Sequence, residues 1–136
     1  MINNAILSNM KKIILDTNFL MIPFQFKVDI ISEIDRICDV KYSLCIIDLT
    51  LKELKGIVEK QKGRNKDAAK LALKLIALKG FRLIKSGKVK DADSAILEIA
   101  TKDHVVCTQD MNLKRKLREK GIRIITLRSR KHLVIS

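Results

Sequence analysis

The sequence of 136 residues lacks tryptophan and contains one tyrosine, four phenylalanines and a single proline. A hydrophobic core must therefore be built mainly from Ile, Leu and Val. No apolar stretch approaches the ~20 residues that span a membrane, and residues 1–9 lack the basic and long apolar regions of a secretory signal. We expect a cytoplasmic protein of one domain, residues 1–136, in which residues 1–9 are a loosely ordered extension.

The three cysteines, Cys38, Cys45 and Cys107, are an odd number without paired spacing. This pattern excludes a disulfide framework and a cysteine-based zinc site. Neither His104 nor His132 has a Ser or Cys partner at an interpretable position, which leaves nucleophilic catalysis with little support. A Gly-rich phosphate-binding loop of the nucleotide-binding kind is also missing.

The net charge is +13, and it is unevenly distributed. Residues 1–50 contain 5 Lys and Arg and 6 Asp and Glu, whereas residues 51–136 contain 23 and 9. Such a basic half indicates a polyanionic partner, either nucleic acid or an anionic membrane surface. The alternative is a Lys-rich surface that is simply solvated. Binding to a membrane surface would need a basic amphipathic helix with a bulky aromatic face, and the sequence contains none.

Apolar runs alternate along the chain with amphipathic segments. The expected strands cover residues 12–15, 42–47, 81–84, 104–108 and 122–127, and a basic tail over residues 128–136 holds a possible edge strand at 132–135. Helices are expected around residues 28–38, 51–60, 66–78, 91–100 and 111–119. Unbroken apolar strands that alternate with helices predict an α/β fold. We expect a three-layer α/β/α sandwich with a central, mainly parallel sheet of about five strands.

Acidic residues follow several of these strands. Asp16 ends the first strand, Asp110 follows the strand that ends at Thr108, and Glu53 lies one turn into the helix after residues 42–47. Asp91 and Asp93 open the helix after the 81–84 strand. Because ligand sites of parallel sheets lie at the carboxyl ends of the strands, we expect these side chains to share one edge.

Each acid alone has a simpler explanation. Asp93 and Asp110 could each cap the N-terminus of a helix, and Asp16 could form an Asx-turn. Glu53 could form an ion pair with a lysine on the surface. Together, four carboxylates at one edge repel each other unless a cation gathers them. Oxygen ligands suit Mg²⁺ or Mn²⁺ better than Zn²⁺. The combined pattern therefore predicts a divalent metal site.

Four short motifs carry a family resemblance: Ile-Leu-Asp-Thr-Asn at 14–18, Leu-Lys-Glu-Leu at 51–54, Asp-Ser-Ala-Ile-Leu at 93–97 and Thr-Gln-Asp-Met-Asn-Leu-Lys at 108–114. In this order the chain, from about residue 12 to 127, resembles the PIN-domain family of metal-dependent ribonucleases. The resemblance is closest to the branch of ribosomal RNA processing nucleases and archaeal toxin-like proteins. Asn112 stands where a second Asp is common in that branch.

The resemblance implies which residues form the site. The catalytic and metal-binding acids would be Asp16, Glu53, Asp93 and Asp110, with Asp91 as an additional acid. Thr17, Asn18 and Thr108 would support these carboxylates. The basic residues expected to contact RNA are Arg64, Lys66, Lys85, Lys88, Lys90, Lys114, Arg115 and Arg118. With few aromatic residues to stack on bases, recognition of RNA shape is favoured.

The activity implied is that of a Mg²⁺- or Mn²⁺-dependent endoribonuclease, and the family resemblance also implies a homodimer. Its role would be ribosomal RNA processing in a pre-ribosomal particle or that of a toxin paired with an antitoxin protein. The alternative is a non-catalytic RNA-binding or ribosome-assembly module on the same fold. The complete acid set argues against that alternative, because a pure binder gains nothing from carboxylates that face phosphate.

Overall fold

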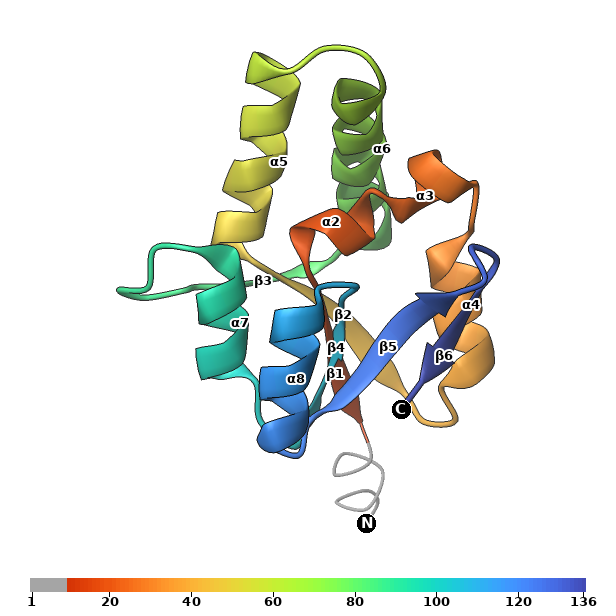
Figure 1. The fold of residues 1–136 in the computed structure, drawn as a ribbon, viewed down its shortest axis with the longest axis vertical. Coiled ribbons are helices and arrows are strands. Elements are labelled where there is room, and N and C mark those ends of the chain that lie inside the picture. Colours follow the sequence, from red (N-terminus) through yellow and green to blue (C-terminus); the bar gives the residue numbers. More distant parts are fainter. Residues whose placement is uncertain (1–9) are drawn as a thin grey trace.

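The computed structural model describes residues 10–136, so the extension expected over residues 1–9 lies outside the described part. Six strands form one sheet in the order β3-β2-β1-β4-β5-β6 (Figure 1). Their bounds are Lys11–Leu15 for β1, Tyr42–Ile47 for β2, Arg82–Ile84 for β3, His104–Cys107 for β4, Arg123–Arg128 for β5 and His132–Ile135 for β6. Every pair is parallel except β5 and β6. The expected mainly parallel α/β sheet is confirmed.

Seven helices connect or precede these strands in the described residues. They are α2 (Thr17–Leu20), α3 (Ile22–Phe26), α4 (Ile30–Ile37), α5 (Asp48–Lys60), α6 (Arg64–Lys79), α7 (Ala92–Ile99) and α8 (Met111–Glu119). The α5 and α6 helices form an antiparallel hairpin that extends beyond the sheet, while α7 and α8 lie side by side (Figure 1). None of the helices in residues 10–136 is long and apolar enough to cross a membrane.

Successive residues of β1 enter two separate cores. Ile13 and Leu15 pack with side chains from α2 to α6, such as Phe19, whereas Ile14 packs with residues of α7 and α8, such as Ile96. Side chains alternate between the faces of a strand, so a central strand covered on both faces must be apolar throughout. This explains the unbroken apolar runs and confirms the three-layer architecture.

One helix begins earlier than expected, and a second begins where expected but with a different cap from Asp93. The α5 helix starts at Asp48 rather than Leu51, and Asp48 Oδ1 accepts a hydrogen bond of 3.2 Å from the backbone N–H of Ser86. The α7 helix is capped by Asp91, whose Oδ2 accepts from the N–H of Ser94 at 3.0 Å. The N-cap explanation for Asp93 is therefore wrong: Asp93 lies in the first turn, which leaves its carboxylate available at the sheet edge.

Candidate active site

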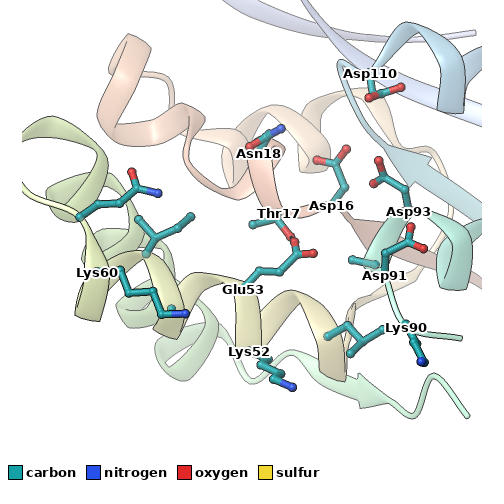
Figure 2. Close-up of a pocket in the computed structure, with 15 residues that line it drawn as sticks. Asp16, Thr17, Asn18, Lys52, Glu53, Lys60, Lys90, Asp91, Asp93 and Asp110 are labelled. Carbon is teal, nitrogen blue, oxygen red and sulfur yellow. The ribbon is translucent and has the colours of Figure 1, made fainter. Parts of the chain in front are cut away.

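The acids expected to converge line one cavity of about 590 Å³ at the carboxyl end of the sheet (Figure 2). The elements that follow β1, β2, β3 and β4 each supply part of its wall. The polar residues predicted for the site that line it are Asp16, Thr17, Asn18, Glu53, Lys90, Asp91, Asp93 and Asp110. Parallel strand order thus brings together acids that are up to ninety-four positions apart in the sequence.

Asp16 is the most buried of these acids, with 3% of its surface exposed. Its Oδ1 accepts a hydrogen bond of 2.7 Å from the backbone N–H of Phe19 and thereby caps α2, in place of the simple turn that the sequence suggested. Its Oδ2 accepts from Thr108 Oγ1 at 2.5 Å. Burial raises the pKa of Asp16 to about 6 although both hydrogen bonds favour the charged form, and the negative charges of Asp93 and Asp110 add to the rise.

Two threonines support the acids. Thr108 Oγ1 donates to Asp16 and also accepts from the backbone N–H of Asp110 at 3.0 Å, so one hydroxyl links two carboxylate-bearing residues. Thr17 Oγ1 donates to Glu53 Oε1, which ties the short helix α2 to α5. Figure 2 shows this pair near the middle of the cavity. Thr17 and Thr108 therefore contact the carboxylates beside which the sequence placed them, and Asn18 lies exposed on the cavity wall.

The other three acids lie on the α7 and α8 side. Burial raises the pKa of Asp93, and the nearby charges of Asp110, Glu53 and Asp91 raise it further. Asp110 caps α8, as one interpretation of the sequence had it, because its Oδ1 accepts from the N–H of Leu113 at 2.8 Å. Hydrogen bonds from Ser94 lower the pKa of Asp91. The pKa values of Asp16 and Asp93 are thus raised first by burial and further by the neighbouring acids.

The residues fit a divalent cation by their chemistry. No ion pair within residues 10–136 joins any of the five acids to a Lys or Arg, and their cluster remains uncompensated. The cavity lining contains carboxylates and no His or Cys, a donor set that suits Mg²⁺ or Mn²⁺.

The carboxylates do not converge on a common position in this structure. In the described part of the chain no three His, Cys, Asp or Glu side chains stand close enough together to hold a metal ion. Asp16, Glu53 and Asp110 each accept a hydrogen bond from a neighbouring group, which holds their carboxylates where they are. Holding a cation would require rotation of the side chains at the cavity wall.

Of the eight basic residues expected to contact RNA, one lines the cavity, and a second, Lys114, lies near two of the acids without lining it. Lys90 lines the cavity. Lys114 is half-buried and close enough to Asp110 and Asp16 for their charges to raise its pKa, although burial and Arg118 lower the pKa more strongly.

The other six do not line this cavity: Arg64, Lys66, Lys85, Lys88, Arg115 and Arg118. The Arg64 guanidinium lies over the Phe24 ring, 5.3 Å from its centroid. Arg115 Nη1 lies 3.6 Å from Glu119 Oε1. Lys85 and Lys88 lie in the loop after β3, whereas for the four residues on α6 and α8 the rotation of the helix decides which side chains face the cavity.

Sequence reasoning missed Lys52, Lys60 and Gln61, which line the same cavity. A signal for Lys60 was present: it follows Glu53 by seven residues, and residues two helical turns apart share one face. Lys52 was harder to find because it precedes Glu53 directly and adjacent helical residues point in different directions.

The comparisons with known proteins agree with this geometry. The family model described as "PIN like domain" matches residues 13–130. Ribonuclease VapC4 of Methanocaldococcus jannaschii is 31% identical over 128 residues, which cover 93% of this chain and 97% of the relative. Ribonuclease VapC9 of Archaeoglobus fulgidus is 29% identical over 124 residues, covering 90% and 87%.

The fold also resembles that of a solved structure. The structure of the PIN domain endonuclease Utp24 superposes with a TM-score of 0.74 at 24% sequence identity, and the match covers 92% of this chain and 90% of the other. This likeness concerns the fold.

Proposed function

The chain belongs to the PIN-like domain family, and we propose that it is a Mg²⁺- or Mn²⁺-dependent endoribonuclease that hydrolyses phosphodiester bonds in RNA. The observation that carries the proposal is the single cavity lined by five carboxylates with no ion pair to a basic residue within residues 10–136. The two relatives that are named ribonucleases support the same activity.

Asp16, Glu53 and Asp93 would hold the metal most directly, and Asp110 would hold a second ion or orient the attacking water. Asp91 is a further acid at the same wall. A bound divalent cation supplies two things: it lowers the pKa of a water molecule, and it neutralises charge on a phosphate oxygen.

The residues around the acids would orient them and the substrate. Thr108 and Thr17 keep the carboxylates of Asp16 and Glu53 in place through hydrogen bonds, as groups that support metal ligands commonly do. Lys90, and Lys114 beside Asp110, would attract the phosphate that is to be cleaved. The buried position of Asp16 limits the access of bulk water to its carboxylate.

The test is cleavage of a structured RNA in the presence of Mn²⁺, with Asp16→Asn and Asp93→Asn as variants and Asp67→Asn as control. Asp67 is an exposed acid in the first turn of α6 and does not line the cavity. We expect the wild type and the control to cleave, and both site variants and a chelated sample to lose activity. Cleavage that survives both site substitutions would contradict the assignment.

Binding of RNA by the wild type without cleavage would instead favour a non-catalytic RNA-binding or ribosome-assembly module. The uncompensated acids disfavour that role, since they repel phosphate in the absence of a cation. The same assay therefore separates the two functions.

Two biological roles accord with the proposed activity. One is ribosomal RNA processing in a pre-ribosomal particle, and the other is that of a toxin inhibited by an antitoxin protein. A small antitoxin gene next to the gene for this chain would support the second role. We further propose a homodimer, which light scattering on the purified protein tests.

A further inference from the structure

We propose that Gly56 leaves an open floor on α5 over which an unpaired strand of RNA reaches the acids, and that Lys52 and Lys60 bind the phosphates that flank the cleaved bond. The inference rests on the proposed ribonuclease function and deepens it. It names the part of the substrate that the enzyme recognises next to the cleavage point: the sugar-phosphate backbone of a single strand.

Gly56 has no structural reason to be glycine. It lies in the interior of the 13-residue helix α5, where glycine is less stable than alanine. A Cβ atom added at Gly56 would meet no other atom within 4 Å, so neighbouring residues do not require a glycine at this position. The other four glycines, by contrast, all have positive φ angles that suit glycine. The missing side chain of Gly56 therefore serves something outside the chain.

The open surface of Gly56 faces the cavity. The cavity-lining residues of α5 recur at intervals of three and four and so form one helix face: Leu49, Lys52, Glu53, Gly56, Ile57 and Lys60. Gly56 lies one helical turn after Lys52 and one turn before Lys60. At 1.5 Å rise per residue, the two lysines are ~12 Å apart along the helix axis. Gly56 therefore leaves a depression in the helix surface between the side chains of Lys52 and Lys60.

Charge along the cavity suits a phosphodiester chain. Figure 2 shows the carboxylates of Asp91, Asp93 and Asp110 gathered on one side, Lys60 on the other, and Glu53 between them. Lys52 and Lys60 are exposed, and neither forms an ion pair within residues 10–136. A strand with one phosphate at the acids therefore meets positive charge along α5. The cavity lining holds no aromatic residue for base stacking, so the contacts are to the backbone.

The first experiment separates stability from activity. Gly56→Ala and Gly56→Leu should raise the thermal midpoint, because both residues favour a helix and an added Cβ meets nothing within 4 Å. Cleavage of an unstructured oligoribonucleotide with Mn²⁺ should fall, by roughly 10-fold or more for leucine, since a displaced substrate loses its alignment. Lys70→Leu is the control: Lys70 is exposed on α6 and lines neither this cavity nor the adjoining hollow that Lys52, Gly56 and Lys60 share with Lys55. Full activity of Gly56→Leu would overturn the proposal.

The second experiment measures binding in the Asp16→Asn background. Lys52→Gln and Lys60→Gln should each weaken binding of the same oligonucleotide and reduce the slope of log K against log salt by about 0.7. Lys70→Gln and Lys74→Gln on α6 are the controls, because neither lines the cavity. An unchanged slope, or equal losses with blunt duplex RNA, would contradict the proposal.

A failure of the proposed function gives a different result. The wild type would then cleave no RNA with Mn²⁺, while the α5 variants would still weaken binding. That outcome would support RNA binding along α5 and would contradict the proposed nuclease function. If the wild type cleaves RNA and neither the lysine variants nor the Gly56 variants change the rate, RNA does not bind along α5. The proposed ribonuclease function is then retained.

Discussion

Thr108 Oγ1 donates a hydrogen bond of 2.5 Å to Asp16 Oδ2 and thereby joins residues that are 92 positions apart. The contact forms because β1 and β4 are parallel neighbours, with Leu15 opposite Cys107, so the next residue of each strand reaches the same edge. The hydroxyl and the carboxylate are both buried. A neutral donor thus stabilises the charge of the acid that lies at the centre of the site.

Replacing Thr108 with valine removes this donor and keeps the shape of the side chain. We expect the pKa of Asp16 to rise further, and metal affinity or cleavage to fall by roughly 10- to 100-fold, as for other groups that support metal ligands. The Mn²⁺ concentration that gives half-maximal cleavage measures the effect. Unchanged Mn²⁺ dependence would show that the hydrogen bond does not matter for the site.

Thr50 provides the matched control. Its hydroxyl is buried in α5 and has no hydrogen-bond partner within the described residues. Thr50→Val removes an unsatisfied polar group, so the free energy of unfolding should rise by up to about 1 kcal/mol, with cleavage unchanged. Urea denaturation measures the first quantity. A loss of activity equal to that of Thr108→Val would mean that threonine hydroxyls act through the fold rather than through the site.

Asp16→Asn separates function from stability. The substitution should abolish metal-dependent cleavage. It should also stabilise the metal-free protein at pH 8, because the pKa of the native carboxyl, about 6, lies above its ordinary value of 3.8 and charging it in the fold is therefore costly. The shift corresponds to at most about 3 kcal/mol. Thermal unfolding with a chelator measures it, and a less stable variant would contradict the prediction.

Glu33 should make stability depend on acidic pH. Its carboxylate accepts hydrogen bonds from Arg36 and from the backbone N–H of Leu133, which lower its pKa to about 2 and hold β6 against α4. Because the folded pKa is depressed, the stabilisation is present above pH 4.5 and is lost as the pH falls toward 2.

The Glu33→Gln variant tests this dependence. It should be less stable than the wild type at pH 6, by about 1 kcal/mol or less because solvent screens the pair with Arg36. The difference in thermal midpoint should shrink near pH 2.5. Glu59→Gln, on the exposed surface of α5, is the control. A difference that stays constant with pH would mean that the charge of Glu33 is not responsible.

Local patterns in the sequence predicted most of the fold. The apolar runs of β1 and β4 indicated strands buried on both faces, and turn residues marked the ends of α6 and α8. The starts of α5 and α7 were harder to locate, because two or three polar residues at each start were all plausible caps. In the structure no side chain caps α5, which begins at Asp48 directly after Ile47, whereas the hydrogen bond from the N–H of Ser94 identifies Asp91 as the cap of α7.

The sequence by itself determined which acids reach the site, since each follows an apolar strand and parallel strands end at one edge of the sheet. Only the tertiary structure decided that Thr108 donates a hydrogen bond to Asp16 and that Thr17 donates one to Glu53. It also decided that Lys60 rather than Arg64 lines the cavity. These contacts depend on the strand order β2-β1-β4 and on the rotation of α5 about its axis. Packing between distant segments sets both, and a local pattern does not contain that information.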